Sequence, residues 1–263
     1  MWAQNKAVPQ RIISLGAAST EILYKVGAGS QIVAVTDVCN YPEEAKSLPV
    51  LGQFGGSSIS TETLLSYEPD LVILYSGMHD YLLPVLQKYE IPYYVSDAVS
   101  IAEVIAEIKR LAVMTGHEKE GAKLEKEYNA QVKAIQKKSA AQIKKAGGAA
   151  KVYWEIWYEP FMSAGGPTFI NDVISIAGGQ NIFAGESQAY PVVSEETIIA
   201  SDPAVILIPS DSFTAVETVK ARRGWNEISA VKNDKVIIIN ADIYSRPGPR
   251  IFEAIKELNG LLY

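Results

Sequence analysis

The chain has 263 residues, of which 48% are hydrophobic and 21% charged, and its formal net charge is −6. No stretch approaches the roughly 20 consecutive apolar residues that a membrane-spanning helix needs. The negative charge argues against nucleic acid as the main partner, because duplex binding requires a basic surface.

The chain begins with Met1–Pro9, a short polar segment without the apolar core of an export signal. We therefore expect either a cytoplasmic protein or a mature form whose signal has been removed. Cys39 is the only cysteine, so an intrachain disulfide is impossible.

Apolar, β-branched runs alternate with helix-like segments, which is typical of an α/β fold. Their apolarity is continuous rather than alternating, which predicts strands buried on both faces of a mostly parallel sheet. The predicted strands are Arg11–Leu15, Ile32–Thr36, Leu71–Tyr75, Tyr93–Val95, Lys151–Trp157, Val205–Ile208 and Val236–Ile239.

Glu118–Ala146 contains no proline, and its apolar residues recur at helical spacing. Glutamates crowd its start, lysines crowd its end, and Gly147 follows, an order that suits the helix dipole and a C-cap. At about 1.5 Å per residue this helix would be about 40 Å long. We interpret it as a rigid connector between two halves; the alternative is a long surface helix of a single domain.

An internal repeat supports the two halves. The segment from Ser60 to the strand at Leu71 and the segment from Ser194 to the strand at Val205 have Ser, Glu, Thr and Pro at the same offsets. Each copy is typical of a serine N-cap, a short helix, a proline break and a buried strand. We predict an N-terminal α/β lobe at 1–115, a connecting helix at 116–148 and a C-terminal α/β lobe at 149–263.

Glu62 and Glu196 occupy the second helical position of the two repeat copies. Charge pattern alone favours a local role, because a glutamate near a helix start interacts favourably with the helix dipole. The other interpretation is that each lobe offers one carboxylate to a partner with two matching arginines, an arrangement that sets orientation.

Ligands of α/β folds bind beyond the carboxyl ends of parallel strands. In this chain those ends carry aromatic rings, which suit a large flat ligand with apolar faces and a polar rim. Trp154 and Trp157 differ by three on one predicted strand, so one of the two should be in the core. The other candidates near strand ends are Phe54, Tyr75, His79, Phe161, Tyr190, Asp242, Tyr244 and Arg246.

Four segments, in order along the chain, resemble class III substrate-binding proteins of ABC importers. They are Arg11–Leu23, Tyr67–Ile73, Ala177–Phe183 and Asp242–Ile251. Within this family the chain is most similar to the cobalamin-binding members. The resemblance implies two lobes bridged by one backbone helix, a periplasmic or extracellular location with or without a lipid anchor, and a monomer.

The resemblance also implies a transported ligand, a corrinoid such as cobalamin, rather than a cofactor. The partner it implies is a membrane permease with its ATPase, docked through Glu62 and Glu196. Haem or an iron–siderophore complex is the alternative ligand, because tyrosine replaces tryptophan at two ligand positions of the pattern. The ligand-contact positions that match are Phe54, Tyr75, Phe161, Tyr190, Asp242 and Arg246, with Tyr244 beside them.

Two candidate side chains have alternative interpretations. His79 follows a strand end and is either an axial ligand for a cobalt or iron ion or an exposed loop histidine. Arg246 lies beside Pro247-Gly248-Pro249, and it either points at the ligand or pairs with Asp242.

The sequence argues against catalysis. It has no glycine-rich phosphate loop, no nucleophile elbow and only two histidines, which lack metal-site spacing. Glu155 and Glu159 are the one carboxylate pair near the aromatic segment, and nothing else marks them as a glycosidase pair. We therefore predict a binding protein without resident metal; a cytoplasmic α/β enzyme is the alternative from another class.

Overall fold

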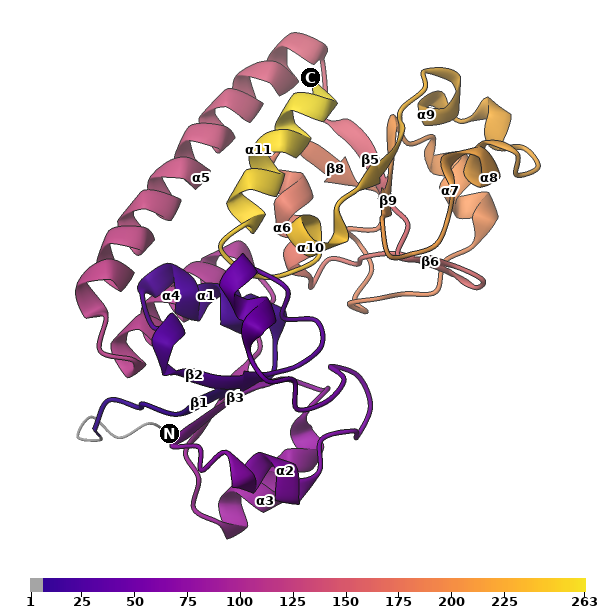
Figure 1. Cartoon of the computed structure of the whole chain (residues 1–263). Helices are drawn as coiled ribbons and strands as arrows, with labels where there is room; N and C mark the ends of the chain where they lie inside the picture. Colours follow the sequence, from indigo (N-terminus) through magenta and orange to yellow (C-terminus); the bar gives the residue numbers. More distant parts are fainter. Residues whose placement is uncertain (1–6) are drawn as a thin grey trace. The chain divides into compact units, whose positions relative to one another are not determined.

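The computed structural model describes residues 7–263, so part of the Met1–Pro9 segment lies outside the described residues. The described chain forms two compact units (Figure 1). Unit 1 comprises the residues up to Ala98 together with Ala102–Glu127, and unit 2 comprises Val99–Ile101 and Tyr128–Tyr263. Each unit is built on its own parallel sheet, which confirms the predicted α/β class with two lobes.

Unit 1 is a parallel four-stranded sheet with the strand order β2-β1-β3-β4. Buried side chains alternate between the two faces of this sheet: Ile13, Val72 and Leu74 pack against α2 and α3. Its elements are β1 (Ile12–Ser14), α1 (Ala17–Val26), β2 (Ile32–Val35), α2 (Thr61–Ser66), β3 (Leu71–Tyr75), α3 (Leu83–Lys88), β4 (Tyr93–Ser96) and most of α4 (Ile101–Met114).

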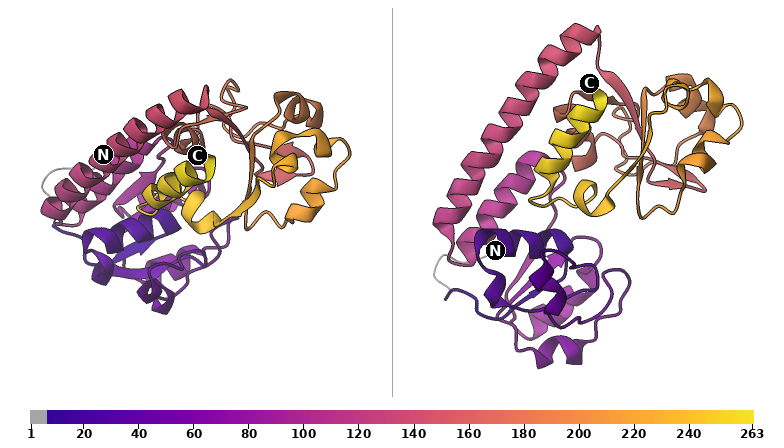
Figure 2. Two further views of the ribbon diagram at one scale, coloured as in Figure 1. Left: turned by 90° about the horizontal axis from the view of Figure 1, so that it is seen from above. Right: turned by 45° about the horizontal axis from the view of Figure 1, so that its top comes forward.

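Unit 2 has a parallel sheet with the order β10-β9-β5-β8 and a separate two-stranded antiparallel ribbon, β6-β7. Helices α7, α8 and α9 cover one face of the parallel sheet, and α6 and α11 cover the other (Figures 1 and 2). Its elements are β5 (Ala150–Trp154), β6 (Trp157–Tyr158), β7 (Phe161–Met162), α6 (Phe169–Ile176), β8 (Gly179–Asn181), α7 (Glu195–Ser201), β9 (Val205–Pro209), α8 (Val216–Lys220), α9 (Ser229–Lys232), β10 (Val236–Ile239), α10 (Ala241–Tyr244) and α11 (Ile251–Leu262).

The two parallel sheets have the same topology. When the strands of each parallel sheet are numbered in chain order, both sheets read second, first, third, fourth. The repeat detected in the sequence occupies the same place in each, because α2 precedes the third strand of unit 1 and α7 precedes the third strand of unit 2. The β6-β7 ribbon is therefore an insertion after the first strand of unit 2.

The N-caps of the repeated helices are also alike. Ser60 Oγ accepts a hydrogen bond from the Thr63 backbone N–H at 3.0 Å, and Ser194 Oγ accepts one from the Thr197 N–H at 3.1 Å. In both helices the capping serine also contacts the threonine hydroxyl. These caps confirm the predicted helix starts, since a serine at this position satisfies a backbone donor that has no partner within the helix.

The predicted long helix is α5 (Glu118–Ala146), which is unbroken and is followed by Gly147 with a φ of 79°. It contributes residues to both units, so the unit boundary falls inside the helix rather than at its ends. In unit 2, its Tyr128 ring stacks on Phe252 of α11 with centroids 3.9 Å apart. Figures 1 and 2 show α11 beside the C-terminal half of α5.

A buried amide fastens the C-terminal half of α5 within unit 2. Asn259 Nδ2 of α11 lies within hydrogen-bonding distance of Ser139 Oγ (3.1 Å), Gln142 Oε1 (2.8 Å) and the Ala177 carbonyl (2.9 Å). Ser139 Oγ in turn donates to the Ile176 carbonyl. Because Asn259 and Ser139 are buried, these bonds join α5, α6 and α11 where water cannot replace them.

The strand predicted at Lys151–Trp157 is shorter than expected. It ends at Trp154, and Trp157 begins the separate strand β6. The β6-β7 ribbon and β8 were not predicted, because each has only two or three residues and β8 is the polar sequence Gly-Gln-Asn. Among residues 7–263 we find no helix with both the length and the apolar character needed to cross a bilayer.

Replacing Asn259 with leucine should destabilise unit 2. The substitution keeps a side chain of similar volume but removes the donor that α5 and α6 share, and the loss should cost about 1–3 kcal/mol. Urea unfolding followed by circular dichroism measures it. Gln136→Ala, an exposed change on α5, is the control and should alter stability by less than about 0.5 kcal/mol. Equal stability of the Asn259→Leu variant and the native chain would contradict this account.

Candidate functional site

In a parallel sheet all strand carboxyl ends lie along one edge, so side chains from strands distant in sequence converge there. Each unit has one such edge. In unit 1 it carries Tyr75 at the end of β3, and in unit 2 it carries Glu155, directly after β5. The positions of the predicted ligand-contact residues are therefore described relative to the carboxyl-end edge of their own unit.

In unit 1 the structure brings Phe54 and Tyr75 together. Their ring centroids lie 5.5 Å apart in an edge-to-face arrangement, and both rings are partly exposed. The Phe54 backbone N–H donates to Asp37 Oδ1 at 2.7 Å, and Asp37 follows the end of β2. We call Phe54 and Tyr75 the aromatic edge of unit 1.

His79 fits neither of its two interpretations, the exposed loop histidine or the axial metal ligand. It is fully buried, and its Nδ1 accepts the Tyr75 backbone N–H at 3.1 Å, which places the proton of the neutral ring on Nε2. A metal ion would need that Nε2 lone pair. Burial also lowers the pKa of His79, which favours the neutral ring. The centroid of its ring lies 5.4 Å from that of Phe54, so the buried His79 packs against the aromatic edge. Within residues 7–263 no three His, Cys, Asp or Glu side chains are grouped so that they could bind a metal ion.

In unit 2 the β6-β7 ribbon presents aromatic side chains. Trp157 is 47% exposed, and its indole N–H donates to the Glu159 carbonyl at 3.1 Å. Tyr158 and Phe161 face each other across the turn with centroids 6.0 Å apart. Trp154 is fully buried, so one tryptophan is in the core and the other on the surface, as predicted, although the strand ends between them.

Tyr190 lies in a segment that runs along β7. The Ser163 N–H donates to the Pro191 carbonyl at 3.2 Å, and the Val193 N–H donates to the Phe161 carbonyl at 2.9 Å. Tyr190 is 48% exposed. The structure thus places Phe161 and Tyr190 on neighbouring chain segments. We call Trp157, Tyr158, Phe161 and Tyr190 the aromatic edge of unit 2.

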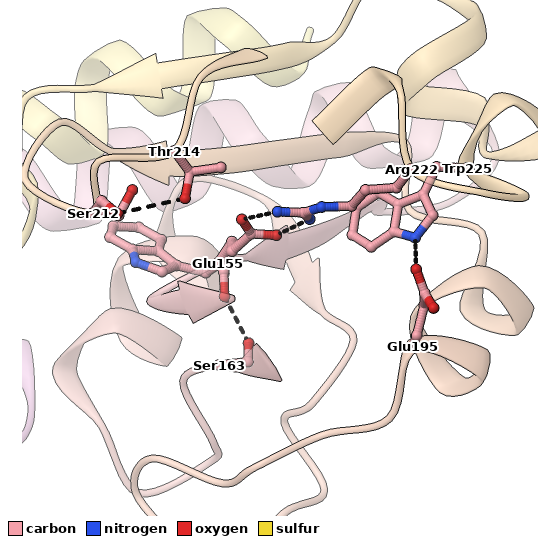
Figure 3. Close-up of polar contacts among 8 residues, drawn as sticks. Glu155, Ser163, Glu195, Ser212, Thr214, Arg222 and Trp225 are labelled. Atoms are coloured by element: carbon pink, nitrogen blue, oxygen red, sulfur yellow. Dashed lines mark hydrogen bonds and ion pairs between the residues drawn. The ribbon is translucent and has the colours of Figure 1, made fainter. Parts of the chain in front are cut away.

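A buried ion pair lies beneath this edge. The Arg222 guanidinium donates to both carboxylate oxygens of Glu155 at 2.5 and 2.8 Å (Figure 3). The same guanidinium lies over the rings of Tyr158, Phe161 and Trp225, at 4.6, 5.0 and 4.5 Å from their centroids. Sequence reasoning missed this role of Arg222, because its partner is 67 positions away. The only signal was a carboxylate directly after a buried strand.

The ion pair with Arg222 also explains why the Glu155 carboxylate can be buried. Its carboxylate is fully buried and both oxygens are occupied by Arg222, so it is a structural group rather than half of a catalytic carboxylate pair. Burial raises the pKa of neighbouring Tyr153, and the Glu155 charge raises it further.

Asp242 and Arg246 form an ion pair at the end of β10, which was one of the two interpretations of Arg246. Asn240 Oδ1 accepts the Asp242 backbone N–H at 2.9 Å and so caps α10. Tyr244 was expected to contact a ligand, but its side chain is only 1% exposed and its ring lies against Trp154. It belongs to the core, because the short helix α10 turns it inward while Asp242 stays 40% exposed.

Glu62 and Glu196 are both exposed in the first turn of their capped helices, α2 and α7. Their positions relative to the capping serines are identical, two residues after Ser60 and Ser194. Each carboxylate is therefore presented to solvent from an equivalent place in its own unit.

Unit 1 also contains a buried glutamate, Glu107 on α4, which is 3% exposed. Burial raises its pKa to about 7, an effect opposed by a hydrogen bond from Ser96 and reinforced by the Asp97 charge. Arg110 lowers it in part. Ser96 is the last residue of β4 and pairs with Tyr75 of β3. Glu107 therefore contacts the strand next to Tyr75.

A family model described as periplasmic binding protein matches residues 12–243. The chain belongs to this family. It is 32% identical over 251 residues to a vitamin B12-binding protein of Vibrio campbellii, covering 95% of this chain and 88% of the relative. It is 30% identical to the uncharacterized ABC transporter substrate-binding lipoprotein YvrC of Bacillus subtilis, covering 98% and 81%.

The crystal structure of the periplasmic vitamin B12 binding protein BtuF of Vibrio cholerae has the same fold. It superposes with a TM-score of 0.83 at 28% identity and covers 97% of both chains. The resemblance to class III substrate-binding proteins is therefore confirmed for this periplasmic binding protein. The family consists of binding proteins, in line with the expectation of binding rather than catalysis.

The buried Glu107 predicts a pH-dependent stability. The folded chain binds its proton up to about pH 7, whereas the unfolded chain releases it near the ordinary value of 4.5. Native stability should therefore fall as pH rises through this interval. Glu107→Gln should be more stable than the native chain at about pH 8, by up to about 3 kcal/mol, and nearly equal at about pH 4.

Urea unfolding of both proteins at these two pH values measures the difference. Glu103→Gln, an exposed change one helical turn earlier, is the control and should give the same small difference at both. A Glu107→Gln effect that does not change with pH would contradict the prediction.

Proposed function

We propose that this periplasmic binding protein captures cobalamin or a related corrinoid and delivers it to an ABC importer. The observation that carries the proposal is the pair of aromatic edges at the carboxyl ends of the two parallel sheets. Relatives named as vitamin B12-binding proteins, similar over nearly the whole chain, support the same ligand.

The chemistry of the edges supports a corrinoid. A corrin ring is broad and flat, with apolar faces and an amide-bearing rim. Partly exposed rings such as Tyr75 and Tyr190 offer wide apolar contact and a hydroxyl donor. Asp242 and Arg246 supply polar groups from the end of β10 that could hydrogen-bond rim amides.

Haem is the alternative ligand, and it would gain from an axial side chain on the iron. His79 is buried with Nδ1 occupied. His117 lies against Gly27, where α1 ends before β2 begins, which is the opposite edge of the sheet from Tyr75. Neither histidine of the chain therefore favours haem over a corrinoid.

The proposal predicts measurable binding of cyanocobalamin at micromolar concentration by isothermal titration calorimetry. Tyr190→Ala and Tyr75→Ala should each weaken binding by about tenfold or more, because a truncated aromatic anchor loses most of its contact area. Tyr89→Ala is a matched control: Tyr89 is 47% exposed but precedes β4, at the other end of the strands.

The control should bind cyanocobalamin as the native chain does. A native chain that gives no heat with cyanocobalamin, but shifts and sharpens the Soret band of haemin, would replace the corrinoid by haem.

For delivery, we propose that Glu62 and Glu196 dock on arginines of the membrane permease of an ABC importer, which works with its ATPase. Both carboxylates are exposed at equivalent helix starts. Charged pairs of this kind set orientation and association rate more than affinity. The protein would act as a monomer outside the cytoplasmic membrane; a lipid anchor is the arrangement named for the Bacillus subtilis relative.

Reversing either charge should impair delivery but not capture. With the permease–ATPase complex of the same organism in liposomes, Glu62→Arg and Glu196→Arg should each reduce stimulated ATP hydrolysis at least about fivefold, because like charges would then face each other. Affinity for cyanocobalamin should stay unchanged. Glu217→Arg, an exposed first-turn change on α8, is the control. Unimpaired stimulation by both variants would rule out this docking mode.

A further inference from the structure

Four side chains of unit 2 form a continuous row, which we call the Arg222 row (Figure 3). Glu155 holds the Arg222 guanidinium with two hydrogen bonds, and the guanidinium lies 4.5 Å from the centroid of the Trp225 ring. The Trp225 indole N–H then donates to Glu195 Oε1 at 2.6 Å. The row is the series Glu155, Arg222, Trp225 and Glu195.

The Arg222 row is shielded from water along most of its length. Glu155 and Trp225 are fully buried, and the Arg222 side chain is only 8% exposed. A two-pronged guanidinium–carboxylate contact fixes both position and orientation, and burial prevents water from substituting for either group. Arg222 therefore has little freedom to move independently of β5.

One side of the row supports the aromatic edge of unit 2. The guanidinium lies over the faces of the Tyr158 and Phe161 rings, at 4.6 and 5.0 Å from their centroids. Phe161 also stacks on Trp225 with centroids 5.8 Å apart. The orientation of these two rings thus depends on where Arg222 and Trp225 lie.

The other end of the row reaches α7. Glu195 is the first residue of that helix and directly precedes Glu196, which is exposed. In unit 1 the equivalent position of α2 is Thr61, so the corresponding helix has no carboxylate there. The link through Glu195 is therefore specific to the unit 2 copy of the repeat.

We propose that Arg222 and Trp225 are positioning residues that hold the aromatic edge of unit 2 and the first turn of α7 on one common support. The inference rests on the proposed function, in which the edge binds ligand and Glu196 docks on the permease. Arg222 holds the Tyr158 and Phe161 rings in place. Trp225 holds the first turn of α7 in place through its hydrogen bond to Glu195.

The first test separates the two ends of the row. Trp225→Phe keeps an aromatic ring beside Arg222 but removes the donor to Glu195. It should leave cyanocobalamin affinity within about twofold of native and raise the concentration that half-saturates stimulation of the permease–ATPase by about tenfold, the change expected for one hydrogen bond to a charged group. A general loss of structure would impair both measurements together.

Two variants of Glu195 distinguish positioning from direct contact. Glu195→Gln keeps an acceptor oxygen for the indole N–H and should behave as native, whereas Glu195→Leu should reproduce Trp225→Phe. If Glu195→Gln were as impaired as Glu195→Leu, its charge rather than its bond to Trp225 would matter, and the proposal would fail.

The other end is tested with Arg222→Lys, which keeps a positive charge for Glu155 but loses the planar group that lies over the rings. It should weaken cyanocobalamin binding by about tenfold and impair docking as well. Arg223→Lys, an exposed change next to it, is the control and should affect neither. Ligand binding by Arg222→Lys equal to native would overturn the role of Arg222.

A measurement without ligand or permease makes the test independent of the proposed function. Hydrogen exchange of the segment 194–201 should be at least about threefold faster in Trp225→Phe and Glu195→Leu than in the native chain and Glu195→Gln. If the native chain bound no corrinoid but these exchange rates differed as stated, the proposed function would fail and the positioning of α7 would stand. Equal exchange rates in all four proteins would overturn the positioning itself.

Discussion

The arrangement of unit 2 depends on the buried pair between Glu155 and Arg222. Removing two charges from water costs several kcal/mol per ion, and a pair without its full set of contacts would destabilise the fold. Here both carboxylate oxygens are bonded and three aromatic rings surround the guanidinium. The pair thus connects the end of the first strand with the segment after α8, and the ring contacts of the guanidinium extend this connection to the inserted ribbon.

A second constraint is the shared topology of the two units. Parallel strands place all their carboxyl ends on one edge of the sheet. In both sheets the first strand lies between the second and the third strand, so the chain leaves it towards one side and later returns on the other. Unit 1 uses this edge to present Phe54 and Tyr75, supported by the buried His79. Unit 2 uses an inserted ribbon for the same purpose. The same backbone plan thus produces an aromatic surface by two different local means.

The sequence predicted those parts of the fold that local patterns encode. The strand at Leu71–Tyr75 and the helix at Glu118–Ala146 have the predicted bounds, because continuous apolarity and charge-ordered helical spacing are strong signals. The ribbon was missed because two-residue strands have no detectable period. Tyr244 was placed at the surface because the sequence does not show which way a four-residue helix turns a ring. The contact of Glu155 with Arg222 joins segments 67 positions apart in the sequence, so no local sequence pattern predicts it.

Thr61 and Glu195 distinguish two helix starts that share a serine N-cap and a glutamate at the second helical position. One short helix begins with a hydroxyl, and the other begins with a carboxylate fastened to a buried indole. A membrane complex that offered the same surface twice would therefore meet two unequal counterparts. Half a turn of such a chain on an exactly twofold partner gives an equivalent complex, so the difference selects no orientation; instead the two contacts within each complex are chemically unequal, since only the helix that begins at Glu195 has its first residue bonded to a buried indole.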